Sequence, residues 1–309
     1  MIRTVAGDVE GLAGPWLCHE HLQIDLCCQK GPEVVLGDAE QADVASDLQR
    51  ARQLGLCGVV DLSVHGSGRK PSNLLNISRL AGLPVVCAAG YYWDPFPAEV
   101  QTGTVGALRD ALVREVTQGI GDTGIRAGVI KIGTGPGAID GAAERLFEAA
   151  ALAALATGAA VVTHTSAVEQ AHWHLDALCS AGLPAERILI SHMGAAQNVE
   201  QLLAVARAGS LMGIDKVGFI ARRSNAELAD LVRDACAAGL AGQLILSSDV
   251  ARKDRLLRRG GSSYGAVFSD FIPMLRERGV TGQDVELMMC GNPQRLLHLA
   301  SPLPLEARS

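Results

Sequence analysis

The chain has 309 residues, of which 48% are hydrophobic and 19% charged, enough apolar material for one large core but little for two full domains. Its net charge of −6 argues against nucleic-acid binding, because phosphate recognition needs a basic face and the one cationic cluster is the short stretch 252–259. The first residues lack the pattern of a signal peptide, and no apolar run approaches the roughly 18–20 residues of a membrane span. We expect a cytoplasmic protein that binds neither nucleic acid nor membranes.

Eight cysteines occur in the chain, none of them in a CxxC pair, and most lie within apolar strand or helix patterns. Structural zinc sites and disulfide frameworks both need a recognisable cysteine spacing. The pattern instead predicts buried free thiols in a reducing compartment.

Short β-type runs alternate with longer helical patterns eight times from residue 16 onward. We predict strands at 16–21, 57–63, 84–90, 125–131, 160–164, 187–192, 210–214 and 243–249. The helical patterns between them lie at 39–54, 72–81, 104–119, 143–157, 168–181, 198–208, 224–239 and 264–278. The first fifteen residues are typical of a short hairpin, and a ninth helical segment is expected at about 281–299.

Two α/β architectures share this alternation, the doubly wound open sheet and the closed barrel. Eight units in this length, with no GxGxxG motif after the first strand, favour the barrel. We therefore predict that residues 1–309 form a single (β/α)8 TIM barrel domain. The active site of such a barrel is built at the carboxyl ends of its strands.

Histidines stand at three of these predicted strand ends. His19 and His21 are two residues apart, so on a strand both imidazoles point to the same face, and Glu20 points to the other. His164 and His192 each follow an apolar run and end their strands. One such histidine is more often a core residue with a hydrogen bond than a ligand, but four at the strand ends of one barrel indicate a metal site.

Lys131 lies within the apolar run GVIKIG, at the predicted end of the fourth strand. An ammonium group beside metal ions would be strongly disfavoured by burial and by repulsion between like charges. Two chemistries would remove its charge: formation of a Schiff base, as in barrel aldolases, or carboxylation by CO2 to an anionic ligand.

Asp249 closes the run LILSSD at the predicted end of the eighth strand. A carboxylate in that position can bind a metal and also accept a proton during hydrolysis, so one residue would be ligand and general base. The alternative role, capping the helix that follows, does not explain the four histidines.

Taken together, these residues resemble the phosphotriesterase family of the amidohydrolase superfamily along nearly the whole chain. The motifs that carry the resemblance are Lys131 and the segments His19-Glu20-His21-Leu22, Gly68-Arg69, Gly90-Tyr91-Tyr92, Thr163-His164-Thr165, Ser191-His192-Met193-Gly194, Ser248-Asp249 and Asn292-Pro293-Gln294-Arg295. The resemblance implies a hydrolase with two divalent metal ions per chain, acting on a small molecule. It favours a homodimer.

The resemblance also assigns the ligands. It places His19, His21 and Asp249 on one metal, and His164 and His192 on the other. Lys131, carboxylated by CO2 to N6-carboxylysine, would bridge the two metals together with a hydroxide. Zinc is the metal that the family favours, although imidazole and carboxylate ligands also accept manganese, cobalt or iron.

Substrate-binding residues are predicted outside this ligand set. Tyr92 falls where lactonase-like members carry a tyrosine near the metals, so it is a second catalytic candidate. Lys216 stands where homoserine-lactone hydrolases resemble one another in having arginine, and Arg252 belongs to a basic loop similar to that of the phosphotriesterase-homology branch. Because cations around a cleft concentrate anions, Lys216 and Arg252 favour an anionic substrate.

The sequence therefore predicts a metal-dependent hydrolase of a lactone or ester that carries phosphate or carboxylate, with weak promiscuous phosphotriesterase activity. Hydrolysis of an N-acyl amine and organophosphate triester hydrolysis are the nearest alternatives, because fold does not choose among them. A Schiff-base aldolase using Lys131 and a non-catalytic binding protein are the others. Neither explains the complete ligand set.

Overall fold

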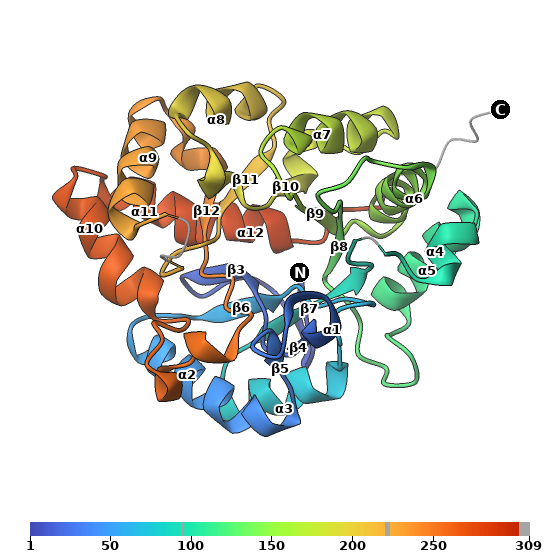
Figure 1. Ribbon diagram of the computed structural model, residues 1–309, viewed down its shortest axis with the longest axis horizontal. Helices are drawn as coiled ribbons and strands as arrows, with labels where there is room; N and C mark the ends of the chain where they lie inside the picture. Colours follow the sequence, from blue (N-terminus) through green and yellow to red (C-terminus); the bar gives the residue numbers. More distant parts are fainter. Residues whose placement is uncertain (94, 220–222, 303–309) are drawn as a thin grey trace.

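Eight parallel strands surrounded by helices form a (β/α)8 barrel, as the alternating pattern predicts (Figure 1). The computed structural model describes residues 1–93, 95–219 and 223–302. Each barrel strand pairs in parallel with the next one along the chain. The strands are β3 (Trp16–Glu20), β6 (Gly58–Asp61), β7 (Val85–Gly90), β8 (Val129–Gly133), β9 (Ala160–His164), β10 (Ile188–Ile190), β11 (Leu211–Ile214) and β12 (Leu244–Leu246).

Helices cover the outside of the barrel and bury an apolar face against its strands. In α6, for example, Leu146, Phe147 and the inward-facing alanines are buried. The longer helices are α2 (Gln41–Gln53), α3 (Pro71–Ala81), α5 (Val105–Thr117), α6 (Gly141–Thr157), α7 (Gln170–Ser180), α8 (Val199–Ala206) and α9 (Asn225–Ala237). The shorter ones are α1 (Cys27–Lys30), α4 (Ala98–Thr102), α10 (Ile272–Glu277), α11 (Gly282–Glu286) and α12 (Asn292–Leu297), and π-helical turns at Val267–Phe271 and Leu287–Gly291 precede α10 and α12. No helix among the described residues is long and apolar enough to cross a membrane.

Side-chain caps begin several of these helices. The Asp140 carboxylate accepts hydrogen bonds from the backbone N–H groups of Ala142 and Ala143 at the start of α6. Ser224 and Glu227 form a reciprocal capping box at the start of α9. These local signals fix where each helix begins, and so fix the loops that connect it to the preceding strand.

Two small antiparallel ladders lie at the two ends of the barrel. Strands β1 (Ile2–Thr4) and β2 (Gly7–Val9) form the N-terminal hairpin, and the N–H of Val5 donates to the carbonyl of Val85 at the start of β7. Strands β4 (Ile24–Asp25) and β5 (Val35–Leu36) enclose α1 in the loop after β3. The second ladder therefore belongs to the end where the barrel strands finish.

The barrel closes between β12 and β3 through hydrogen bonds near the ends of both strands. The N–H of Asp249 donates to the carbonyl of His19 (3.1 Å), and the N–H of His19 donates to Oγ of Ser247 (3.0 Å). The Glu20 carboxylate accepts the N–H groups of Ser248 (2.7 Å) and Val250 (2.9 Å). Two of the predicted metal ligands, His19 and Asp249, therefore lie at the seam where the barrel closes.

Several predicted boundaries need correction. Lys131 does not end its strand, because β8 continues to Gly133, where it still pairs with His164 of β9. His21, His192 and Asp249 lie one to three residues beyond their strands, since the backbone leaves the ladder before them. The cysteines are free, but only Cys18 and Cys87 are buried as expected. The others are partly buried (Cys57, Cys236 and Cys290) or exposed (Cys27, Cys28 and Cys179).

Gly90, the last residue of β7, provides a test of barrel packing. Its φ of +130° is unfavourable for other residues, and a Cβ atom there would overlap the carbonyl oxygen of Lys131. We expect Gly90→Ala to lower the free energy of unfolding by about 3 kcal/mol or more, measured by urea denaturation. Gly55→Ala is the matched control, because Gly55 also has a positive φ (+110°) but no atom within 4 Å of the added Cβ. Equal losses for the two variants would contradict the close approach at Gly90.

Candidate metal centre

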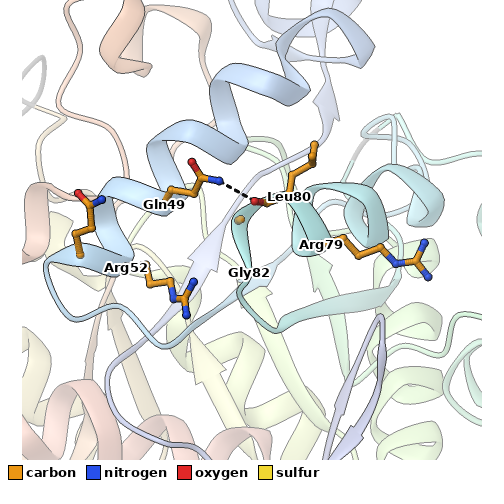
Figure 2. Close-up of a pocket in the computed structure, with 7 residues that line it drawn as sticks. Gln49, Arg52, Arg79, Leu80 and Gly82 are labelled. Atoms are coloured by element: carbon orange, nitrogen blue, oxygen red, sulfur yellow. Dashed lines mark hydrogen bonds between the residues drawn. The ribbon is translucent and has the colours of Figure 1, made fainter.

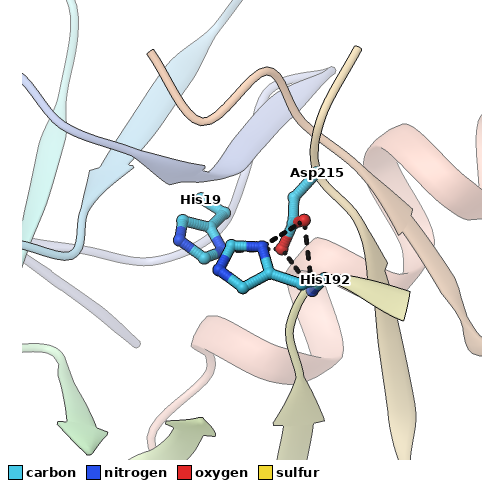
Figure 3. Close-up of side chains that lie close together, drawn as sticks. All are labelled: His19, His192 and Asp215. Carbon is cyan, nitrogen blue, oxygen red and sulfur yellow. Dashed lines mark hydrogen bonds and ion pairs between the residues drawn. The ribbon is translucent and has the colours of Figure 1, made fainter. Parts of the chain in front are cut away.

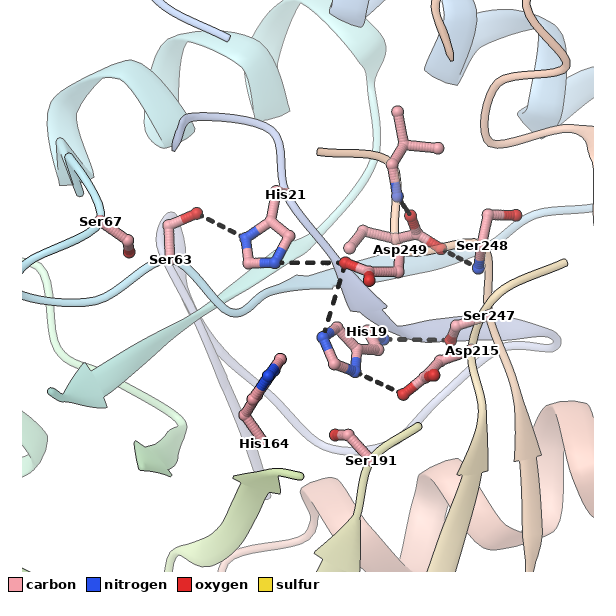
Figure 4. A network of polar contacts seen from close by, with 12 residues as sticks. His19, His21, Ser63, Ser67, His164, Ser191, Asp215, Ser247, Ser248 and Asp249 are labelled. Carbon is pink, nitrogen blue, oxygen red and sulfur yellow. Dashed lines mark hydrogen bonds and ion pairs between the residues drawn. The ribbon is translucent and has the colours of Figure 1, made fainter. Parts of the chain in front are cut away.

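The six predicted metal ligands come together at the carboxyl end of the barrel. They are provided by β3, β8 and β9 and by the segments directly after β3, β10 and β12. Figure 4 shows His19, His21, His164 and Asp249 pointing into one space, with Ser191 and Asp215 at its edge. All six side chains are buried or nearly so.

The first group of ligands is His19, His21 and Asp249. Oδ1 of Asp249 lies 3.4 Å from Nε2 of His21 and 3.7 Å from Nε2 of His19. Zinc binds nitrogen and oxygen ligands at roughly 2.0–2.2 Å, so two ligands on one tetrahedral ion lie about 3.3–3.6 Å apart. The donor set and its spacing fit a divalent metal.

The second group is His164 and His192. Nδ1 of His164 lies 2.8 Å from Nε2 of His192, a hydrogen-bond separation and somewhat closer than two ligands on one ion. Burial lowers the pKa of both imidazoles, and the neighbouring charge of Lys131 lowers that of His164 further. Neutral imidazoles have the free lone pair that a metal ligand needs.

The Asp215 carboxylate contacts the Nδ1 atoms of two of these histidines, His19 and His192 (Figure 3). Its Oδ2 lies 2.7 Å from Nδ1 of His19, and its Oδ1 lies 2.8 Å from Nδ1 of His192. It also accepts the backbone N–H of His192. Although burial raises the pKa of Asp215, His192 and His19 hold it well below its usual range. With Nδ1 of each ring occupied by this carboxylate, Nε2 is left to face the site.

Asp249 and His21 are held in the same manner. Ser63 contacts Nδ1 of His21 (2.8 Å) and leaves its Nε2 toward Asp249. The Glu20 carboxylate binds the backbone on both sides of Asp249. Burial raises the pKa of Asp249, but Lys216 and His19 hold it well below its usual range, so this ligand is ionised.

The backbone is strained at two of the ligands. His192 (φ +64°) and Asp249 (φ +49°) adopt left-handed conformations, and Ser263 is the one other non-glycine among the described residues with a positive φ. Such conformations cost about 1–3 kcal/mol and persist where the surrounding contacts enforce them. At His192 and Asp249 those contacts come from Asp215 and Glu20.

Lys131 is buried, and it is close enough for its charge to act on His19 of the first group and His164 of the second. Its Nζ lies 3.5 Å from Oγ of Ser191, and no carboxylate of the described part of the chain lies within ion-pair distance. Burial lowers the pKa of Lys131 to about 7, although Asp215 and Asp249 oppose this effect. Burial therefore favours the neutral amine of Lys131 over the ammonium form.

The comparisons with known proteins identify the family. The model of the phosphotriesterase family matches residues 1–297 of this chain. The chain belongs to the phosphotriesterase family. Members of this family are metal-dependent hydrolases, and so is this protein.

Three known proteins illustrate how similar this chain is to its relatives. The phosphotriesterase homology protein of Escherichia coli (strain K12) is 32% identical over 91% of this chain and 97% of that protein. A crystal structure of the Escherichia coli protein, complexed with phosphate in its active site, has a TM-score of 0.89 at 30% identity and covers 94% of this chain and 100% of that one. A solved structure described as organophosphate hydrolysis engineered from a weak promiscuous lactonase template has a TM-score of 0.85 at 28% identity, over 96% of this chain and 100% of that one. The N-acetyltaurine hydrolase of Dictyostelium discoideum is 25% identical over 81% of this chain and 71% of that protein.

Of the other predicted site residues, Tyr92 and Lys216 contact the predicted ligands of this phosphotriesterase-family centre, and Arg252 does not. Tyr92 is buried, its ring meets His164 edge-on, and its hydroxyl accepts a hydrogen bond from Lys30. Lys216 is partly exposed and forms an ion pair with Asp249. Arg252 forms an ion pair with Asp254, two residues further along the same loop, and has no hydrogen bond or ion pair to the predicted ligands among the described residues. Arg255, in the same basic stretch, is buried and donates to the carbonyl of Val217.

Four residues that support the phosphotriesterase-family site were missed by sequence reasoning. Glu20 was recognised only as the residue between two histidines, and Asp215 was not singled out. Ser63 and Lys30 had no motif to mark them. A carboxylate at the end of an apolar strand, as in the run MGID, was the available signal for Asp215.

A separate cavity of about 450 Å³ lies between α2 and α3 (Figure 2). It is lined at the ends of these helices by Gln49, Arg52, Gln53, Arg79, Leu80, Ala81 and Gly82. Barrel helices run opposite to the strands, so this cavity lies at the end of the barrel where strands begin. In Figure 2 the guanidinium group of Arg79 points away from that of Arg52, so the two cations do not converge on one ligand.

Asp215 allows a direct test of how the histidines are oriented. Replacement by Asn leaves one acceptor oxygen for two rings and introduces a donor beside one of them. We expect Asp215→Asn to weaken metal affinity roughly 10–100-fold, as measured by competition with a chromogenic chelator. Asp110→Asn, at an exposed carboxylate paired with Arg109, is the control and should leave the affinity unchanged. Unaltered affinity in Asp215→Asn would show that the histidines do not need this carboxylate.

Proposed function

We propose that this protein is a binuclear metal-dependent hydrolase of lactones or carboxylic esters that carry an anionic group. The observation that carries the proposal is the pair of ligand groups described above. His19, His21 and Asp249 would hold one ion, and His164 and His192 the other. When bound, two divalent ions would polarise the substrate oxygen and make water nucleophilic at neutral pH.

Lys131 is the proposed bridging residue, carboxylated on Nζ. A buried amine between two metal groups, with Ser191 at 3.5 Å and no carboxylate in ion-pair distance among the described residues, favours a reaction that makes the group anionic. Addition of CO2 to the neutral amine forms the N–C bond and releases one proton, so the product is a carbamate anion. A Schiff base would need a carbonyl substrate and no metal, and would leave the surrounding histidines without a role.

Carboxylation of Lys131 can be observed directly. Apoenzyme reconstituted with zinc and ¹³C-bicarbonate should show a carbamate resonance in the ¹³C NMR spectrum, and should regain activity faster than enzyme reconstituted in CO2-depleted buffer. The resonance should disappear in Lys131→Met, which retains the chain's other lysines as internal controls. Borohydride trapping of a substrate carbonyl on Lys131, with activity indifferent to chelators, would instead establish the aldolase.

Asp249 and Tyr92 are the proposed catalytic residues beside the metals. Asp249 is ionised, and its Oδ2 faces the ammonium of Lys216, so the carboxylate can accept a proton as the nucleophile attacks. Burial raises the pKa of Tyr92, so its phenol stays protonated and can donate to a carbonyl or ring oxygen of the substrate. Phosphotriesters would react weakly, because the same groups would have to accommodate a tetrahedral phosphorus.

The anionic part of the substrate is inferred from Lys216 and Arg252. Lys216 is partly exposed and forms an ion pair with Asp249, and Arg252 follows on the loop after β12. The relative from Escherichia coli with phosphate in its active site and the relative built on a lactonase template support this choice. A lactone that bears a phosphate, such as a phosphorylated sugar lactone, meets both requirements.

An N-acyl amine with an anionic tail is the second candidate. The similarity to an N-acetyltaurine hydrolase favours it, because taurine carries a sulfonate that the same cations would bind. A screen of metal-loaded enzyme against lactones, phosphorylated lactones, N-acyl amines and aryl phosphotriesters separates the two candidates.

Lys216→Met and Arg252→Met test the anion pocket. Each should lower kcat/KM for an anionic lactone about 10–100-fold more than for its uncharged analogue, since a charged hydrogen bond contributes about 1.5–3 kcal/mol. The comparison between the two substrates removes any effect of Lys216 on Asp249 itself. Arg258→Met, which removes an exposed cation bound to Asp43, is the control. If both variants kept the wild-type kcat/KM with every anionic substrate, Lys216 and Arg252 would not bind the anionic group of the substrate.

A further inference from the structure

Lys30 contacts two aromatic residues of the site from the loop after β3. Its ammonium group donates to the hydroxyl oxygen of Tyr92 (2.9 Å) and lies 4.1 Å from the ring centroid of Trp93. These contacts join α1 to the segment after β7. Nothing in the sequence marked this lysine.

The aromatic residues continue from Lys30 to a metal ligand. The rings of Tyr92 and Trp93 stack with centroids 4.3 Å apart. Both meet the ring of His164 edge-on, at 5.5 Å and 4.4 Å. Lys30, Tyr92, Trp93 and His164 therefore form one packed unit.

The position of Lys30 is fixed by the backbone of its loop. The N–H of Lys30 donates to the carbonyl of Leu26, whose own N–H donates to Val34. The N–H of Asp25 donates to Ser67, and the carbonyl of Glu33 accepts the N–H of Lys253. The loops after β6 and β12 thus hold α1 on either side.

The direction of the hydrogen bond between Lys30 and Tyr92 has a chemical consequence. An ammonium group has donors and no acceptor, so the phenol oxygen is the acceptor. The hydroxyl proton of Tyr92 is then not used by Lys30 and is available to another oxygen. A hydroxyl that accepts a bond from a cation is also a stronger donor, because hydrogen bonds in a chain polarise one another.

We propose that Lys30 is a positioning residue of the active site, which fixes the Tyr92 hydroxyl as a hydrogen-bond donor toward the reacting oxygen of the substrate. The inference rests on the proposed role of Tyr92 in hydrolysis. Lys30 acts through the phenol and does not itself touch the substrate. The hydrogen bond from Tyr92 is strongest in the transition state, where charge develops on that oxygen. Loss of Lys30 should therefore lower kcat more than it changes KM.

A double-mutant cycle tests this assignment. Lys30→Met should lower kcat about tenfold with little change in KM, Lys30→Arg should restore part of the loss, and Lys30→Met should change kcat less than twofold in a Tyr92→Phe background. Lys70→Met is the control, because it removes the same charge from an exposed residue paired with Asp38. An equal loss in the Tyr92→Phe background, or no loss in the wild-type background, would overturn the proposal.

The cycle uses whichever substrate the wild-type enzyme hydrolyses, so it does not depend on the lactone assignment. If lactones are inert and an aryl phosphotriester is cleaved, the proposed substrate is wrong, and the cycle on the phosphotriester still decides the role of Lys30. If Tyr92→Phe is fully active on every substrate, the role of Lys30 fails whatever the substrate is.

Tryptophan fluorescence gives a second readout that needs no substrate. Lys30→Met should change the emission of the protein, because the ammonium lies over the Trp93 ring, and the change should vanish in a Trp93→Phe background that retains Trp16 and Trp173. The same change in both backgrounds would mean that Lys30 acts on the fold as a whole, which contradicts the proposal.

Discussion

The buried carboxylate of Asp215 is the interaction on which the site depends. It lies behind His19 and His192, which belong to distant parts of the chain, and binds Nδ1 of both rings. A buried charge is costly unless it is paired, and here the ring and the backbone N–H of His192 form hydrogen bonds to Asp215, while Nδ1 of His19 lies 2.7 Å from its Oδ2 as an ion-pair contact. The rings cannot rotate without breaking these bonds. Their Nε2 atoms therefore point into the site before any metal binds, which reduces the cost of assembling the ligands.

Closure of the barrel imposes a second constraint on the same residues. Glu20 of β3 and Ser247, directly after β12, bind backbone N–H groups across the seam between these two strands. Asp249 leaves this seam in a left-handed conformation. The strained backbone of Asp249 lies at the seam, where the hydrogen bonds that close the barrel keep it in place. The stability of the barrel and the position of the Asp249 carboxylate are therefore coupled.

Much of the fold, and the convergence of the candidate ligands at one end of the barrel, could be predicted from the sequence. Eight alternating patterns predicted the barrel, and the apolar runs before His164 and His192 placed the first at the end of its strand and the second just beyond it. Lys131 was identified because a charged residue inside an apolar strand is unusual. The supporting residues could not be found in the same manner, because the partners of Asp215 and Glu20 lie up to about 230 positions away along the chain. Lys30 acts across a packing contact between two loops, and loop positions have no periodicity from which contacts can be read.

The metal content of the protein tests the central claim most directly. Enzyme prepared without chelators and loaded with zinc and bicarbonate should contain two ions per chain by inductively coupled plasma mass spectrometry. The Asp249→Asn and His164→Asn variants should each lose metal, and removal of both ions should abolish hydrolysis. Fewer than one ion per chain in enzyme that hydrolyses its substrate fully in the presence of chelators would contradict the account.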